Sequence, residues 1–113
     1  PVIKDYAETV KAHGTTGGSI TVNLENGNVH TITLNAATTF TFSNPPASGK
    51  AGSLTLIITQ ASTAVSVTWP SSVDWVYGSA PDLSGDSTDY VLVFLTTDGG
   101  TTWRGWLSGS AFA

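Results

Sequence analysis

The stretch Asp89–Gly109, DYVLVFLTTDGGTTWRGWLSG, decides the fold class that the sequence predicts. Each residue from Tyr90 to Leu95 is apolar. Both faces of that segment should therefore be covered, as in a central strand of a packed sheet. The run Asp98-Gly99-Gly100 predicts a tight turn, because glycine adopts positive φ at little steric cost and aspartate can bond the turn backbone.

The chain should return from this turn as a second strand that carries Trp103, Trp106 and Leu107. Gly105, between the two tryptophans, leaves room for a neighbouring side chain. The register of this hairpin is open. A three-residue turn would place Leu95 opposite Trp103, whereas a two-residue turn would place Thr96 there.

Short apolar or alternating segments separated by turn residues recur along the rest of the chain. They predict further strands at Ser19–Leu24, Val29–Leu34, Thr38–Phe42, Ser53–Thr59 and Val65–Trp69, with a short bridge at Val73–Trp75. Asn26-Gly27 between the first two is a strong hairpin signal. About seven or eight short strands and no convincing helix predict an all-β fold, an antiparallel β-sandwich of jelly-roll type.

The domain organisation follows from the length and from a glycine-rich break. A chain of 113 residues is expected to be one domain. We expect residues 1–18 to form an N-terminal arm or edge strand that ends at Gly14–Gly18, and residues 19–113 to form the sandwich. Because the chain begins at Pro1 and contains no Met, we expect it to be the C-terminal piece of a longer polypeptide.

The composition restricts the classes of partner. Charged residues make up only 11% of the chain, the net charge is −4, and cysteine is absent. Nucleic-acid backbones and anionic membranes require clustered Lys and Arg, so neither is an expected partner. No apolar run approaches the length of a membrane span, and no signal peptide opens the chain.

Catalytic and cofactor motifs are absent from the sequence. The two histidines, His13 and His30, lie in no recognisable nucleophile motif, and the glycine-rich runs lack the lysine of a phosphate-binding loop. We therefore predict neither an enzyme nor a cofactor. Asp82, Asp86 and Asp89 lie close together in one loop and could gather around Ca²⁺, although ordinary solvated turn acids are the alternative.

The aromatic residues are the strongest candidates for a binding role in the sequence. Aromatic faces stack on sugar rings and anchor protein interfaces. We expect Trp69 and Trp106 to pack in the core, whereas Trp75 and Tyr77 adjoin a polar loop and are candidates for exposure. The candidate binding residues are Trp75, Tyr77, Asp82 and Arg104, with no catalytic or metal-binding residue.

Two resemblances to known families follow from short motifs. The run Thr96–Trp103, TTDGGTTW, resembles the Asp-box of sialidase-type propellers, with Thr at the usual Ser position. In that family the box stabilises a hairpin away from the catalytic site, and a propeller needs far more chain than this. This resemblance therefore supports a turn and implies no sialidase activity.

The second resemblance rests on the order of three blocks. They are Gly27-Asn28-Val29 followed by Thr38–Gly49, then Val67–Trp75, then Thr96–Trp106 with the terminal Ala111-Phe112-Ala113. Together they resemble a β-rich module at the C-terminal ends of bacteriophage tail-fibre, head-fibre and related virion appendage proteins. The resemblance covers about residues 19–113 and implies a homotrimeric, non-enzymatic module exposed on the virion surface.

Three hypotheses about function remain open at this stage. The leading one is a trimeric fibre or spike tip that contributes to recognition of a host glycan or surface protein, with an interface that includes some strand aromatics. The second is a purely structural module that registers and caps the three fibre chains. The third is a stand-alone, monomeric carbohydrate-binding module that exposes Trp75 and Tyr77.

Overall fold

A computed structural model describes residues 6–113, and the chain is all-β, as the sequence predicts. The strands are β1 Val10–Asn23, β2 Val29–Ser43, β3 Gly52–Thr59, β4 Val67–Thr68, β5 Val73–Trp75, β6 Asp89–Thr96 and β7 Trp103–Ser110. Two single turns of 3-10 helix, η1 Leu24–Asn26 and η2 Val76–Gly78, are the helical elements of this part of the chain. The expected arm begins among residues 1–5, which lie outside the described residues, and no helix in residues 6–113 is long and apolar enough to cross a membrane.

The predicted hairpin is present at the centre of the sheet. Strand β6 lies between β3 and β7 and is antiparallel to both. Its register places Leu95 opposite Arg104, which is the register of the two-residue turn. The Asp98 carboxylate holds the turn by accepting bonds from the backbone N–H of Thr102 at 2.9 Å and the hydroxyl of Thr96 at 3.0 Å. The bond from Thr102 is the main reason that the pKa of Asp98 is lowered.

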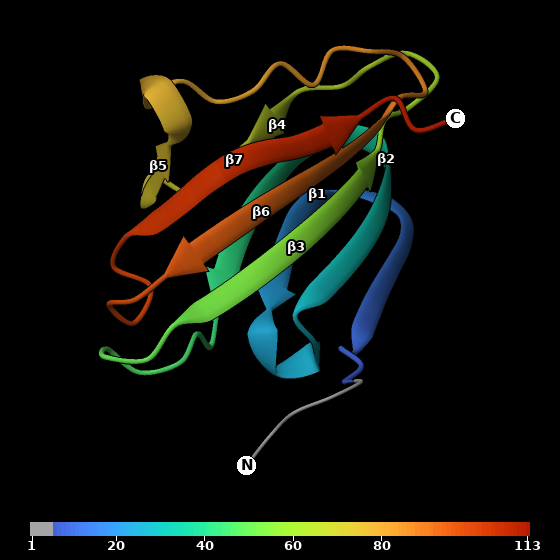
Figure 1. The fold of residues 1–113 in the computed structure, drawn as a ribbon. Coiled ribbons are helices and arrows are strands. Elements are labelled where there is room, and N and C mark those ends of the chain that lie inside the picture. Colours follow the sequence, from blue (N-terminus) through green and yellow to red (C-terminus); the bar gives the residue numbers. More distant parts are fainter. Residues whose placement is uncertain (1–5) are drawn as a thin grey trace.

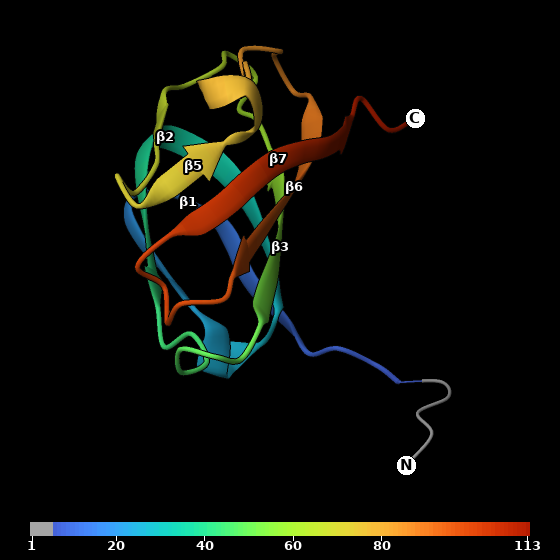
Figure 2. The same ribbon diagram turned by 60° about the vertical axis from the view of Figure 1, so that its left-hand side comes forward.

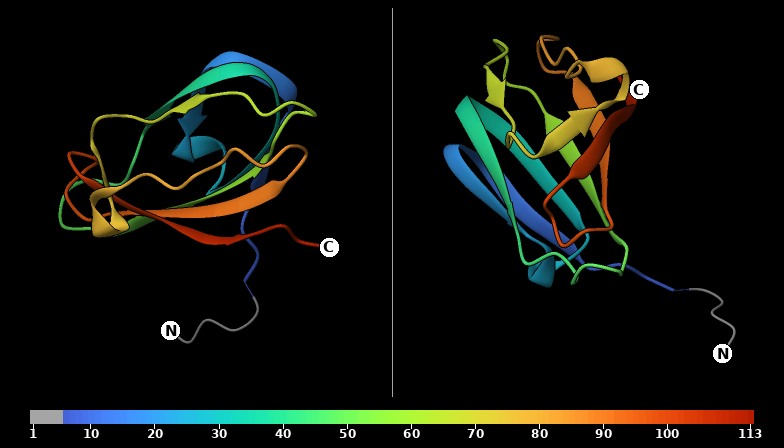
Figure 3. Two further views of the ribbon diagram at one scale, coloured as in Figure 1. Left: turned by 90° about the horizontal axis from the view of Figure 1, so that it is seen from above. Right: turned by 90° about the vertical axis from the view of Figure 1, so that its left-hand side faces the viewer.

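Strands β1 and β2 are long because each one bends and contributes to two layers (Figures 1 and 3). They pair in parallel from Val10–Val29 to Asn23–Ser43, with register shifts near the bend. Gly17 and Ala36 meet at this corner, where a Cβ on Gly17 would lie 2.9 Å from the Cβ of Ala36. The glycine-rich segment therefore bends one continuous strand and does not end it, since bulges and glycines let a strand turn from one layer into the other.

The strand pairing is mixed, so the antiparallel part of the prediction is wrong. The first parts of β1 and β2 form one layer with β3, β6 and β7, which we call the first layer. The last parts of β1 and β2 form the second layer with β4. Strand β2 pairs in parallel with β1, β3 and β4. β5 and β7 are also parallel. The two layers are consistent with a β-sandwich, but the jelly-roll order is not confirmed.

The hairpin predicted at Asn26-Gly27 is also wrong. The residues before it, Ser19–Asn23, pair with Thr39–Ser43 in the second layer and not with the strand that follows. Asn26 ends the η1 turn, and Gly27 has φ 141°, outside the geometry of a two-residue hairpin. Gly27 is required for a different reason, because the backbone carbonyl of Thr9 occupies the place of its missing side chain.

The core lies between the two layers and is aromatic at its centre. Phe42 of the second layer packs edge-on against Phe94 and Trp103 of the first, with ring centroids 4.9 and 5.2 Å apart. Gly105 leaves room for the rings of Phe94 and Trp75, since a Cβ there would lie 3.0 Å from both. The buried aliphatic positions alternate along the strands and include Val22, Ile32, Leu34, Leu54, Leu56, Ile58 and Leu92. Burial also alternates in β6, where Val91, Val93 and Leu95 are only half-buried, so the prediction that both faces of Tyr90–Leu95 are covered is wrong for this chain by itself.

The close contact at the corner predicts that a larger residue at Gly17 destabilises the fold. The substitution Gly17→Val should destabilise the fold by about 1–3 kcal/mol, because its side chain would overlap the backbone and Cβ of Ala36. Denaturant unfolding measures this change. Ser19→Ala, at an exposed position of the same strand, is the control and should stay within about 0.5 kcal/mol of the parent chain. Equal stability of all three proteins would contradict the tight corner.

Candidate functional site

The outer surface of the first layer is apolar and carries little charge. Residues on neighbouring strands lie side by side in rows, because the registers of β2, β3, β6 and β7 coincide. One row is Val29–Thr55–Val93–Trp106, the next is Thr31–Ile57–Val91–Gly109, and the third contains Ser53, Leu95 and Arg104. We call this surface the outer face; its apolar members are Val29, Ile57, Val91, Val93, Leu95 and Trp106.

Among residues 6–113, the charged side chains that we assign to the outer face stand at its two ends. Asp89 lies at one end and is bonded by the Thr59 hydroxyl at 3.0 Å. Arg104 and Asp74 are register partners at the other end. Trp106 is 37% exposed between them, so the prediction that it packs in the core is wrong. Its neighbours Gly105 and Trp103 are buried, because alternate residues of β7 face the core.

A hollow of about 340 Å³ adjoins this end of the outer face. It is lined by Asp74, Trp75, Val76, Arg104, Gly105 and Trp106, and it forms where β5 lies beside β7 (Figure 2). Two predicted binding residues, Trp75 and Arg104, therefore meet at one place. Trp75 is not fully exposed, because its ring packs against Trp69 and Phe94.

Tyr77, in the η2 turn that follows β5, projects fully into solvent. It is 99% exposed, which agrees with the prediction, and its backbone has φ 58°. A bulky residue with positive φ is an outlier that costs free energy, and such outliers cluster at functional sites. Val76 beside it is also exposed. The turn thus presents two apolar side chains next to the hollow.

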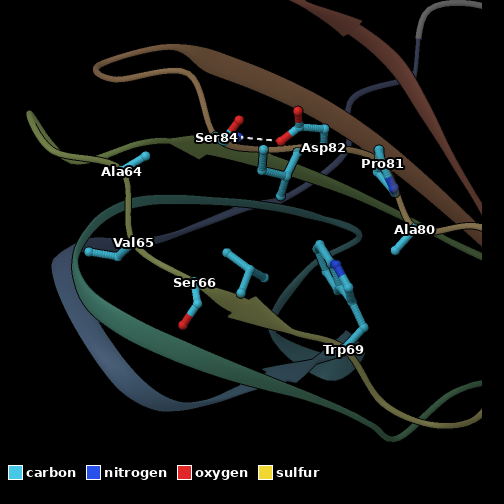
Figure 4. Close-up of a pocket in the computed structure, with 10 residues that line it drawn as sticks. Ala64, Val65, Ser66, Trp69, Ala80, Pro81, Asp82 and Ser84 are labelled. Carbon is cyan, nitrogen blue, oxygen red and sulfur yellow. Dashed lines mark hydrogen bonds between the residues drawn. The ribbon is translucent and has the colours of Figure 1, made fainter.

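The fourth predicted residue, Asp82, lies in a separate cleft between β4 and the loop that precedes β6 (Figure 4). This Asp82 cleft has a volume of about 330 Å³. Its lining is Ala64, Val65, Ser66, Val67, Trp69, Ala80, Pro81, Asp82, Leu83 and Ser84. Asp82 accepts a bond from the backbone N–H of Ser84 at 2.9 Å. Bonds from Ser84 are the main cause of the lowered pKa of Asp82.

Gln60 fixes both walls of the Asp82 cleft. Its side chain is 2% exposed, and its Nε2 donates to the carbonyls of Val65 at 2.9 Å and Leu83 at 2.8 Å. Its Oε1 accepts from the backbone N–H groups of Ala61 and Val65, each at 3.1 Å. Every donor and two acceptor positions of the amide are therefore used. Sequence reasoning missed this residue, since no local pattern marks one glutamine after a strand.

The three loop acids do not converge on one point. The Asp86 carboxylate accepts from the backbone N–H of Ala64 at 2.8 Å, whereas Asp82 and Asp89 bond other segments. Within residues 6–113, no group of three or more His, Cys, Asp or Glu side chains is arranged to hold a metal ion. The calcium alternative therefore gains no geometry to support it.

The two histidines form a stacked pair near the start of β2. His13 Nε2 lies 2.9 Å from His30 Nδ1, and His30 Nε2 lies 2.9 Å from the carbonyl oxygen of Gly27. His30 must donate to this carbonyl, so its Nδ1 accepts the proton of His13. Burial is the main cause that lowers the pKa of each ring, and the positive charge of Lys11 adds to it. No serine, cysteine or carboxylate takes part in these bonds, so the pair joins β1 to the turn before β2.

Comparison with known proteins adds no family to these observations. No protein-family model, no curated protein and no solved structure matches the chain at a significant level.

The bonds of Gln60 predict a stability effect. Gln60→Ala should lower the free energy of unfolding by about 3 kcal/mol, because it leaves backbone groups of Val65 and Leu83 without hydrogen-bond partners. Denaturant unfolding gives the value. Thr63→Ala, at an exposed position of the same loop, should change it by less than about 0.5 kcal/mol. A loss no greater than that of Thr63→Ala would count against the clamp.

The histidine pair predicts a pH dependence of stability. Both pKa values lie below the ordinary 6.5, so between these values the unfolded chain binds more protons than the folded one. This contribution to stability is fully present above the ordinary value and is lost as the pH falls through the lowered values. The free energy of unfolding should therefore decrease from about pH 7 to about pH 5. The double variant His13→Gln/His30→Gln should flatten that slope; an unchanged slope would assign it to other groups.

Proposed function

We propose that this chain is a non-enzymatic module of a virion fibre or spike, in which three copies associate and present a surface that contacts the host. The observation that carries the proposal is the outer face. The row Val29–Thr55–Val93–Trp106 and the row Thr31–Ile57–Val91–Gly109 contain no charged side chain. Such a face is suited to burial against another protein surface.

The composition of the outer face favours another copy of the same chain as its binding partner. Oligomers of one chain are closed by symmetry, and their interfaces are more apolar than the rest of the surface. The face fits this composition and includes the partly exposed ring of Trp106, a residue type enriched at interface centres. Phe112, 60% exposed, extends the apolar surface by packing its ring over Gly109.

The resemblance of the sequence blocks to phage appendage modules supports three copies rather than two. The blocks match turn and core positions, so they support the type of module and leave the ligand open. Host contact is supported separately by Tyr77. A fully exposed tyrosine with a strained backbone has no role in the packing of this domain.

A structural cap that only registers the fibre chains is the second candidate, and the same outer face supports it. The two functions differ in what loss of the module does to the particle. Loss of a cap should prevent assembly of the fibre. Loss of a receptor-binding module should spare assembly and abolish adsorption to the host. A stand-alone carbohydrate-binding module, the third candidate, would be a monomer.

Association through the outer face can be measured directly. The chain should elute as a trimer in size-exclusion chromatography with multi-angle light scattering at micromolar concentration. Val93→Lys should give monomers, because it introduces a charge into the row Val29–Thr55–Val93–Trp106 of the outer face. Thr39→Lys adds the same charge at an exposed position of the second layer and should remain trimeric.

Two results would contradict this proposal. A monomeric parent chain would favour the stand-alone binding module. A trimer that dissociates with Thr39→Lys and survives Val93→Lys would move the interface to the other layer. Circular dichroism of each variant shows whether its fold is retained, so that a loss of association is not confused with unfolding.

A further inference from the structure

We infer that the Asp82 cleft is a binding site for one uncharged sugar ring. This inference rests on the proposed function, because it names the class of host-surface ligand that the module would contact. The cleft is distinct from the hollow beside Trp106. It lies on β4 and on the loops that flank it and precede β6, and it shares no residue with the outer face. Burial of the outer face in a trimer therefore does not use the residues of the cleft.

The cleft has the size and rigidity of a preformed ligand site. Its volume of about 330 Å³ lies at the lower end of the range for small-molecule pockets, which is suitable for a monosaccharide unit. Gln60 joins the wall at Val65 to the wall at Leu83, and Asp86 adds a bond to Ala64. Both walls are thus held in place before any ligand arrives, which lowers the entropic cost of binding.

The lining matches the two surfaces of a sugar ring. The indole of Trp69 stands at one end of the cleft, with Val65, Val67 and Leu83 as further apolar lining (Figure 4). These groups suit the C–H surface of a pyranose, and aromatic rings are common partners for it. Ser84 and Asp82 add a hydroxyl and a carboxylate group that can bond sugar hydroxyls.

The charge of the cleft selects against acidic ligands. Its ten lining residues, all within the described part of the chain, include one carboxylate and neither Lys nor Arg. The Asp82 carboxylate is exposed and ionised at neutral pH, since bonds from Ser84 lower its pKa. One of its oxygens accepts the Ser84 bond, and the other can accept from a sugar hydroxyl. Phosphates and acidic sugars would be repelled, so the ligand class is an uncharged saccharide.

The experiment is an NMR titration of the ¹⁵N-labelled chain with three methyl glycosides, of glucose, galactose and mannose. At least one of them should shift backbone amides of residues 64–69 and 80–84, with a dissociation constant of about 1–10 mM. N-acetylneuraminic acid, which is anionic, should leave these amides unshifted. Choline chloride is included because a carboxylate beside an indole can also attract a quaternary ammonium group.

Two matched variants assign the binding to Asp82. Asp82→Asn retains the oxygen that accepts from Ser84 but loses the charge, so the affinity should fall about five- to tenfold. Glu25→Gln makes the same change of charge at an exposed position of the η1 turn, outside the lining, and should bind within about twofold of the parent chain.

The outcomes that overturn the inference are separate from those that test the trimer. The inference fails if none of the three glycosides shifts the cleft amides, if choline or the acidic sugar does so instead, or if Asp82→Asn and Glu25→Gln weaken binding equally. A chain that is trimeric by light scattering and fails this titration retains the proposed association and loses only the sugar site. A monomer that binds a glycoside loses the trimer and retains the site.

Discussion

The close approach of β1 and β2 at their common bend is the constraint on which the rest of the structure depends. Two strands can turn the same corner in parallel only if their backbones touch there, and Gly17 permits this contact with Ala36. The bend places Val22 and Phe40 opposite the first layer, where they help to close the core. Without it, each strand would continue past the edge of a single sheet with one apolar face uncovered.

The Asp82 cleft lies where the path from β3 to β4 differs from the paths of β1 and β2. β1 and β2 change layers inside continuous strands, whereas β3 and β4 are separated by the segment from Gln60 to Ser66. A loop at this corner cannot use a strand ladder to satisfy its buried backbone groups, so the Gln60 amide bonds them instead. These bonds fix Val65 and Leu83, which lie on the two walls of the cleft.

Local signals in the sequence predicted the parts of the fold that depend on local physics. The hairpin at Asp98, the strand at Val29–Leu34 and the exposure of Tyr77 each follow from neighbours along the chain. The parallel pairing could not be predicted in this way, because it is set by contacts between residues about twenty positions apart. The exposure of Trp106 could not be predicted either, because the sequence does not show which face of β7 meets the second layer.

Several polar side chains of this domain are engaged with its backbone and hold its turns in place. Asp98, Asp86 and Gln60 each bond main-chain groups of turns, and His30 bonds the carbonyl of Gly27. In residues 6–113, no buried side-chain nitrogen or oxygen lacks a partner. What the fold leaves free is surface: an apolar sheet face, an exposed tyrosine and a rigid cleft with one carboxylate.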